Sequence, residues 1–382
     1  MRERQFTDCV DIVGASCKPF EGNRRYISTG AVATDHIDEN DVEIVDYKSR
    51  PSRADLIVEP GTLLFAKMQG TKKTLYVDKE KAENIYSTGF FALKAKSGVI
   101  STRCLYHMLG STSFLTQKDK NCSGATQKAI TNAGLKKIRV SIPDYQLQEA
   151  IADQLDKISS VIQMRRSELQ KLDDLVKARF VEMFGDPKSN PHEYEKPQLK
   201  ETCKVITGNT PSRAIREYYG DCLEWIKTDN IVSGVLNPTA AVEKLSRSGV
   251  DVGRTVDAGT ILMACIAGSI ASIGRVCVTD RKVAFNQQIN AIVPQKYNVL
   301  FLYTLLQISK DYLVEEINMA LKGILSKSKL EEKHFILPPM ESQDEFASFV
   351  EQVDKSKFVE SIHVLKLIKE AIAKEVSHDR IR

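Results

Sequence analysis

The feature that most constrains this 382-residue chain is that it repeats part of itself. The segment IPDYQLQEAIADQLDKI begins at Ile142, and the related segment LPPMESQDEFASFVEQV begins at Leu337. Five positions of the first segment recur 195 residues later: Pro143, Gln148, Ala152, Leu155 and Ile158 match Pro338, Gln343, Ala347, Val350 and Val353. A proline followed by apolar residues three and four apart predicts the start of an amphipathic helix. The chain therefore contains the same element twice.

The residues before each proline also repeat. YIST at 26–29 matches WIKT at 225–228, VEPGTLLFA at 58–66 matches VDAGTILMA at 256–264, and FFAL at 90–93 matches INAI at 289–292. Each Gly-Thr followed by an apolar run predicts a turn and a buried strand, and residues 101–112 and 298–309 are typical of short amphipathic helices. The pattern indicates an internal duplication in which each copy holds one mixed α/β globular part and one helix.

The first long helix is predicted from Ile151 to Met183, where apolar residues are spaced 4, 3, 4, 3 and only Arg165 and Arg179 interrupt the seam. Gly185 and Pro187 are placed to end it. Such a seam needs a partner, and the C-terminal segment 339–382 offers a similar one. We expect the two helices to pack against each other. Homodimerisation through either helix is the competing interpretation, and the two arginines could bind the partner helix, another subunit or DNA phosphate.

The composition excludes several classes of protein. The eight cysteines are scattered without a C-x-x-C pair, which argues against a zinc site or a disulfide framework and fits a cytoplasmic location. We find neither an apolar run of about 20 residues nor an apolar leader at the start. Lys and Arg outnumber Asp and Glu by 22 to 17 in residues 1–144 and by 19 to 17 in residues 185–338. This surplus is a weak pointer to nucleic acid.

Catalytic motifs are missing. The chain has no G-x-x-x-x-G-K-[ST], H-E-x-x-H or G-x-S-x-G pattern, and its single Pro-Pro pair, Pro338-Pro339, belongs to the element before the second helix. An adenine methyltransferase would need an Asn/Asp-Pro-Pro-aromatic loop to grip a flipped base. We therefore expect a protein that is not itself an enzyme and that binds no metal.

The order of these elements resembles the specificity subunit of a type I restriction–modification system over the whole chain. The second copy carries VITGNTPS, WIKTDNI, AGTIL, NQQINAI and LPPMESQ; the first carries YISTG, PGTLL, STGFFAL, GATQKAI and IPDYQLQ, followed by RFVEMFGDP. Each piece alone is unspecific, whereas their doubled order is specific. The first copy departs from the pattern in having GASCKP where the second has G-x-T-P.

The resemblance implies an α+β fold: two α/β target-recognition domains, 1–144 and 186–338, separated by a long antiparallel helical coiled coil of residues 145–185 and 339–382. It also implies that each domain reads one half of a bipartite double-stranded DNA target. The subunit would carry modification subunits, two of them, and restriction–translocase subunits. S-adenosylmethionine, ATP and magnesium would bind to those partners, with no cofactor in this chain.

The helix from Ile151 to Met183 suits a spacer. Its 33 residues are about 50 Å long, equivalent to at most about 15 base pairs. Adding one heptad to it should lengthen the tolerated DNA spacer by about 3 base pairs.

Sequence readout requires Arg, Lys, Asn or Gln on loops that reach base edges, together with basic groups that hold phosphates. The candidate DNA-binding residues of the first copy are Arg24, Arg25, Lys67, Gln69, Lys72, Lys73, Thr126, Gln127 and Lys128. Those of the second copy are Lys227, Thr228, Asn230, Ser269, Asn286, Gln287, Gln288, Lys322 and Lys327.

Several candidates have a structural interpretation as well. Lys72 and Lys73 could form an ordinary charged hairpin turn, and Asn286 and Gln287 could satisfy backbone groups inside the globular part. Tyr26 and Trp225 sit between apolar neighbours, which favours core positions over stacking on bases.

Two hypotheses from different classes follow. The first is a non-catalytic DNA-recognition subunit. The alternative is a bivalent protein-binding scaffold with a dimerising pair of helices that does not bind DNA. Ionic strength separates them, because DNA affinity falls steeply with salt. A methyltransferase–specificity fusion is disfavoured by the missing catalytic loop.

Overall fold

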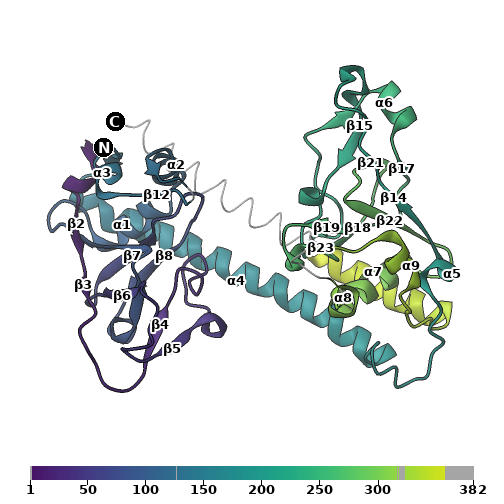
Figure 1. The fold of residues 1–382 in the computed structure, drawn as a ribbon, viewed down its shortest axis with the longest axis horizontal. Helices are drawn as coiled ribbons and strands as arrows, with labels where there is room; N and C mark the ends of the chain where they lie inside the picture. The colour runs from purple at the N-terminus through teal and green to yellow at the C-terminus, as the bar shows by residue number, and fades with distance from the viewer. Residues whose placement is uncertain (1, 126, 316, 318–322, 358–382) are drawn as a thin grey trace. The chain divides into compact units, whose positions relative to one another are not determined.

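The computed structural model describes residues 2–125, 127–315, 317 and 323–357. They gather into two compact units, unit 1 (Met1–Val161) and unit 2 (Ile162–Arg382) (Figure 1). The division falls inside the 40-residue helix α4 (Tyr145–Phe184), so each unit includes part of it. The finer four-segment division expected from the sequence stays a prediction.

Unit 1 is built around a four-stranded sheet that is buried on both faces. Its strands, in the order β2-β10-β7-β8, are β2 (Val10–Val13), β10 (Phe90–Ala95), β7 (Thr62–Ala66) and β8 (Thr74–Val77). Along β7, Leu63 and Phe65 join one hydrophobic cluster, whereas Leu64 and Ala66 join another. Because alternate side chains of a strand point to opposite faces, two covered faces require the unbroken apolar run LLFA of residues 63–66.

A second, five-stranded sheet completes unit 1. Its strands, in the order β3-β6-β9-β4-β5, are β3 (Ala15–Ser16), β6 (Ala54–Ile57), β9 (Ile85–Ser87), β4 (Arg24–Ile27) and β5 (Glu43–Val45). β4 and β9 pair in parallel, with Tyr26 opposite Ile85. Tyr26 is 4% exposed and belongs to the core, as the sequence predicts.

Short elements close unit 1 around these sheets. The helices are α1 (Thr102–Leu109), α2 (Thr112–Lys120) and α3 (Asn132–Leu135). The strands are β1 (Arg2–Gln5), which pairs with β13 (Arg139–Ile142), and β11 (Cys122–Ser123), which pairs with β12 (Ala129–Ile130). The helix expected over residues 101–112 is confirmed as α1, with Ser101 as its N-cap.

Unit 2 repeats the first sheet in the same order. Its strands are β14 (Cys203–Thr207), β22 (Ile289–Pro294), β18 (Ile261–Ala264) and β20 (Val276–Val278). Ile261 and Met263 face one cluster and Leu262 and Ala264 face another, as in β7. The predicted duplication is therefore visible in strand order and in the division of side chains between two cores.

The second sheet of unit 2 repeats the parallel pairing. Its strands, in the order β16-β15-β21-β17, are β16 (Lys244–Leu245), β15 (Tyr219–Ile226), β21 (Val283–Phe285) and β17 (Thr255–Val256). Trp225 lies opposite Ala284 in the parallel pair β15–β21, the equivalent of Tyr26 opposite Ile85. Trp225 is 2% exposed, so its predicted core position is also confirmed.

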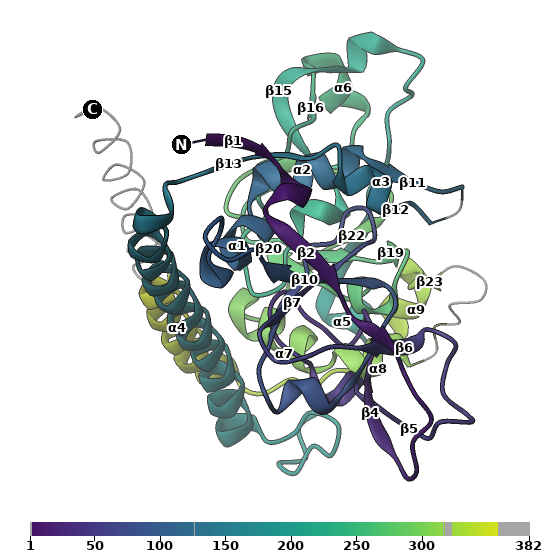
Figure 2. The ribbon, with the colours of Figure 1, turned by 90° about the vertical axis from the view of Figure 1, so that its left-hand side faces the viewer.

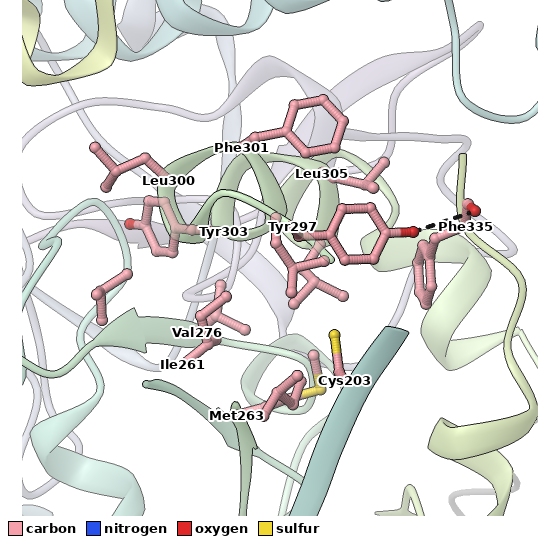
Figure 3. Packing of buried hydrophobic residues seen from close by; sticks show 14 of the residues in the cluster. Cys203, Ile261, Met263, Val276, Tyr297, Leu300, Phe301, Tyr303, Leu305 and Phe335 are labelled. Carbon is pink, nitrogen blue, oxygen red and sulfur yellow. Dashed lines mark hydrogen bonds between the residues drawn. The ribbon is translucent and has the colours of Figure 1, made fainter. Parts of the chain in front are cut away.

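Helices cover the first sheet of unit 2. They are α5 (Leu199–Thr202), α7 (Val299–Ile308), α8 (Lys310–Val314) and α9 (Lys327–Glu332). The helix α6 (Arg247–Val252) instead packs against β15 of the second sheet, and two short strands, β19 (Ile266–Ala267) and β23 (Gly323–Ile324), pair with each other. Figure 3 shows α7 over the sheet, with Phe301 and Leu305 in the cluster. The Tyr297 hydroxyl donates to the Phe335 carbonyl oxygen at 3.4 Å.

The second half of α4 packs against a C-terminal helix of residues 340–357 within unit 2 (Figure 2). Phe180 meets Phe346 edge-on at 5.4 Å between ring centroids. Arg179 pairs with Glu345, and Asp173, nearer the start of α4, pairs with Lys357. Residue numbers rise along α4 in the direction in which they fall along the helix of residues 340–357. The predicted antiparallel packing is therefore confirmed for this stretch. Arg179 therefore binds the partner helix, while residues 358–382 lie outside the described part.

The end of α4 follows the sequence prediction. Gly185 adopts a left-handed φ of +71°, and a Cβ there would lie 2.2 Å from the Pro191 ring. Glycine avoids both the strain and the clash. Over the residues that the structure describes, the helices are too short or too polar to cross a membrane.

Candidate nucleic-acid interface

In unit 2, four loops meet where strands of the two sheets end. We call residues 208–211, 227–230, 265–269 and 286–288 loop cluster 2. The Asn286 amide N donates to the Ile226 carbonyl oxygen at 3.0 Å, and the Cys265 amide N donates to the Gln288 carbonyl oxygen at 2.8 Å. These backbone bonds tie the ends of β15, β18 and β21 together. Most second-copy candidates, from Lys227 to Gln288, are thus brought into one place.

Gly208 allows the 208–211 loop to approach the 286–288 loop closely. A Cβ on Gly208 would lie 2.1 Å from the Asn286 carbonyl oxygen, so any larger residue would push the loops apart. Two positions further on, the Thr210 hydroxyl donates to the side-chain oxygen of Gln287. Thr210 belongs to the G-x-T-P motif, but sequence reasoning did not place it at the site.

A chain of charges supports the 227–230 loop. The Lys227 ammonium lies 2.6 Å from the Glu243 carboxylate, which also pairs with Arg213 at 2.6 Å. The hydrogen bond from Lys227, followed by that from Arg213, holds the pKa of Glu243 below its usual value. The Arg213 guanidinium also covers the Trp225 ring at 5.1 Å. Neither Arg213 nor Glu243 was predicted, because their partners lie in other segments of the chain.

The amide side chains of loop cluster 2 are engaged to different degrees. Asn286 is 5% exposed, and its Oδ1 accepts from the Gln288 amide N at 3.1 Å, in keeping with the structural interpretation. Asn230 Nδ2 donates to the Thr239 hydroxyl at 3.2 Å. Gln287 and Ser269 are exposed. These two have the freest access to an outside partner among the amide and hydroxyl candidates of this cluster.

In unit 1 the equivalent strand ends form loop cluster 1, which we define as residues 28–30, 67–73, 88–89 and 127–129 without masked residue 126. The Lys67 ammonium donates to the Thr88 carbonyl oxygen at 2.8 Å and lies 4.5 Å from the centre of the Phe91 ring. Burial lowers the pKa of Lys67. The Lys73 ammonium donates to the Thr29 carbonyl oxygen at 2.7 Å. Both lysines therefore tie loop ends together while carrying positive charge to the cluster.

The 67–73 loop connects β7 to β8 as a hairpin, as the sequence allows. The Gln69 amide N donates to the Lys128 carbonyl oxygen at 2.9 Å, which joins this loop to the segment before β12. Gln69, Lys72, Gln127 and Lys128 are exposed at this junction. The structure thus groups four first-copy candidates that can reach an outside ligand.

Arg24 and Arg25 lie elsewhere. They begin β4, whereas Thr29 follows its end, and five residues of extended chain span roughly 15 Å. One Arg25 guanidinium nitrogen, Nη2, donates to both carboxylate oxygens of Glu39 at 2.8 and 2.9 Å, and Arg24 covers the Phe20 ring at 4.7 Å. The two arginines are exposed but separate from loop cluster 1.

The remaining candidates complete the comparison. Lys327 stands on α9, where it pairs with Glu331 at 3.5 Å. The Thr228 carbonyl oxygen accepts from Arg275 at 3.3 Å. Thr126 and Lys322 lie outside the described residues. The DNA-binding role of every candidate stays a prediction.

Comparison with known proteins places the chain in a family. A family model for the type I restriction modification DNA specificity domain matches residues 12–173 and again residues 191–369. The chain belongs to this family. Its two matches correspond to the two copies of the repeat.

Relatives of known kind agree with this assignment. The chain is 22% identical over 340 residues to the specificity subunit of the type I restriction enzyme HindI of Haemophilus influenzae, with 68% of this chain and 72% of that protein covered. It is 23% identical over 335 residues to the specificity subunit of the type I restriction enzyme MjaIX of Methanocaldococcus jannaschii, with 80% and 75% covered.

A solved structure supports the fold of this specificity subunit. The S subunit of a type I restriction–modification system from M. genitalium superposes with a TM-score of 0.52 at 13% identity, over 97% of this chain and 94% of that one. At this identity the likeness concerns the fold alone. Type I specificity subunits act with DNA and with modification and restriction subunits.

Proposed function

We propose that this specificity subunit is a non-catalytic reader of a bipartite DNA target, in which each unit recognises one half-site through its loop cluster. The supporting observation is that the loop clusters are built twice on the same framework. Parallel pairs with Tyr26 opposite Ile85 and Trp225 opposite Ala284 lead into them. Two loop clusters with the same framework and different amino-acid sequences suit two different half-sites.

The chemistry of the loops supports DNA as the ligand. Exposed Gln69 and Gln287 carry amides of the kind that pair with adenine, and Lys72 and Lys128 supply exposed ammonium groups for phosphates. Loops anchored to rigid strand ends hold such groups in place before DNA arrives, which reduces the entropy lost on binding.

The helices extend this proposal to the assembly. We propose that α4 and the helix of residues 340–357 set the spacing between half-sites and dock two modification subunits, with restriction–translocase subunits joining the complex. S-adenosylmethionine, ATP and magnesium would belong to those partners, and the complex would work in the cytoplasm. The antiparallel pairing of Asp173 with Lys357 and Arg179 with Glu345 supports a stiff two-helix element.

Selection of bound DNA from a randomised library tests this function. The full chain with its modification subunit is incubated with duplex DNA from a randomised library, and bound sequences are recovered and read. We expect enrichment of two short conserved blocks separated by a fixed spacer, with affinity that falls steeply as salt rises. Equal recovery of all sequences would contradict the proposal, and absence of DNA binding would favour a protein-binding scaffold.

A further inference from the structure

Lys118 on α2 is a buried lysine that is not among the residues proposed to contact DNA. Its side chain is 1% exposed. Its ammonium donates to the carbonyl oxygens of Met68 at 2.9 Å and Thr71 at 2.7 Å, and it lies 3.3 Å from the Asp119 carboxylate. Burying an ammonium is costly unless its donors find partners, so these bonds fix where the 68–71 segment lies.

Asp119 forms hydrogen bonds with the same segment. Its Oδ1 accepts from the Gly70 amide N at 3.0 Å, and its carbonyl oxygen accepts from Gln69 Nε2 at 3.2 Å. The last turn of α2 therefore contacts each residue from Met68 to Thr71. These contacts join residues about 50 positions apart in the sequence.

The opposite side of the loop is held by the first residue of β12 and the residue before it. Met68 forms a β-bridge with Ala129, and the Gln69 amide N donates to the Lys128 carbonyl oxygen. The loop is thus fastened on both sides, while Gln69 and Lys72 stay exposed.

Unit 2 uses a comparable arrangement. Ile266 pairs with Ile324 in β19–β23, the counterpart of the bridge between Met68 and Ala129. On the other side, the Lys310 ammonium of α8 donates to the Ala271 carbonyl oxygen at 2.6 Å. In both units a lysine of α2 or α8, the second helix that follows the first sheet, bonds to the loop that follows β7 or β18.

We propose that Lys118 is a positioning residue for sequence readout by unit 1. It holds residues 68–71 so that Gln69 meets a base edge and Lys72 a phosphate, without touching DNA itself. Lys310 does the same for the 265–272 loop of unit 2. This inference rests on the proposed function.

The test compares Lys118→Met with Lys120→Met in the full chain bound to its modification subunit. Methionine keeps much of the length of the lysine side chain and removes the ammonium. Lys120 is exposed on the same helix and serves as the matched control. The probe is the randomised duplex library, and the quantity measured is the ratio of affinities for the wild-type consensus and for single-base changes in each half-site.

For Lys118→Met we expect discrimination at one half-site to fall by about 5- to 100-fold, the range that one or two base contacts provide. Discrimination at the other half-site should be unchanged, and the slope of log affinity against log salt should become shallower by no more than the single Lys72 phosphate contact provides, about 0.9. Lys310→Met should reduce discrimination at the other half-site, the one read by unit 2. Lys120→Met should match the wild type. Equal loss at both half-sites, or full discrimination in folded Lys118→Met, would overturn the inference.

A second variant covers misfolding. Asp119→Ala removes the acceptor for Gly70 at a half-buried position and should give a smaller loss confined to the same half-site. If Lys118→Met unfolds, this variant decides, and unchanged discrimination in it rejects the inference. Failure of the wild-type complex to enrich a split sequence would instead reject the proposed function, so the two failures are distinct.

Discussion

Gln148 and Gln343, 195 residues apart, make the same hydrogen bonds at the start of two different helices. Gln148 Oε1 accepts from the Ser101 amide N at 2.7 Å, and its Nε2 donates to the Pro143 carbonyl oxygen at 3.1 Å. Gln343 Oε1 accepts from the Asn298 amide N at 2.9 Å, and its Nε2 donates to the Pro338 carbonyl oxygen at 2.8 Å. Each amide joins its long helix to the N-cap of the helix on the sheet.

Gln148→Leu should destabilise unit 1, because the buried Ser101 amide and the Pro143 carbonyl lose a partner. We expect a decrease of about 2–4 kcal/mol in the free energy of unfolding. Urea denaturation measures this decrease, and amide hydrogen exchange locates it in unit 1. Gln154→Leu, an exposed position on the same helix, should change stability by less than about 0.5 kcal/mol. Equal effects of both changes would refute the structural role of Gln148.

Phe180→Ala should loosen the antiparallel helix pair. Phe180 is fully buried against Phe184, Phe301 and Phe346, with ring centroids 5.1 to 5.4 Å away. Deleting such a ring costs about 3–5 kcal/mol. Guanidinium denaturation of the full chain, with hydrogen exchange in unit 2, gives the value. The next residue, Val181, is 47% exposed, and Val181→Ala should be nearly neutral. A loss below about 1 kcal/mol for Phe180→Ala would speak against this packing.

Gly208→Ala should separate the loops of loop cluster 2, because its methyl group would meet the Asn286 carbonyl oxygen. We expect about 1–3 kcal/mol of destabilisation and weaker discrimination at the half-site read by unit 2. Gly268→Ala in the same cluster is the control, since a Cβ there meets nothing within 4 Å. Thermal melting and the library assay measure the two effects. Tolerance of alanine at both positions would be inconsistent with this geometry.

Lys72→Ala should weaken DNA binding similarly for all sequences. If the exposed Lys72 neutralises one phosphate, the slope of log affinity against log salt becomes shallower by about 0.9. Titrations at several salt concentrations provide the slope. Lys79→Ala, at the far end of β8 from the loop, should leave it unchanged. A change in base preference without a change in slope would assign Lys72 to base contact instead.

Glu224 should make unit 2 sensitive to acid. Its carboxylate lies 2.5 Å from Arg281 Nε and accepts from the Ala241 amide N at 2.7 Å, and the hydrogen bond from Arg281 is the largest cause that lowers the pKa of Glu224. Because the folded-state pKa lies below the usual 4.5, the contribution is complete above about pH 4.5 and is lost as pH falls through the folded-state value.

The Glu224→Gln variant tests this dependence. It should be less stable than the wild type at pH 7 and should lose less stability on acidification. Denaturant titrations between pH 3 and pH 7 measure both. Glu217→Gln, an exposed change on the same part of unit 2, should follow the wild type throughout. Parallel curves for wild type and Glu224→Gln would disprove the assignment.

Much of the architecture could be predicted from the repeat. The turns at Gly61 and Gly259, the buried strands after them and the core positions of Tyr26 and Trp225 follow from local pattern, because strand and turn preferences act over a few residues. The candidate lysines and glutamines were also found by residue type.

The environment of each candidate could not be predicted. Asn286 and Gln287 are neighbours of similar chemistry, yet one is buried and the other exposed. Arg24 shares β4 with Tyr26 but lies at the end remote from the loops. Lys118 carried no signal, because its partners lie about 50 residues away in the sequence.

By itself, the sequence determined that this protein has two related halves, each with a helix that needs a partner, because apolar periodicity and duplication are written along the chain. Only the tertiary structure decided which strand ends meet, and so which polar groups bond to one another and which face outward. Those outcomes depend on contacts between distant segments, and a hydrogen bond across such a distance leaves no trace in the spacing of residues.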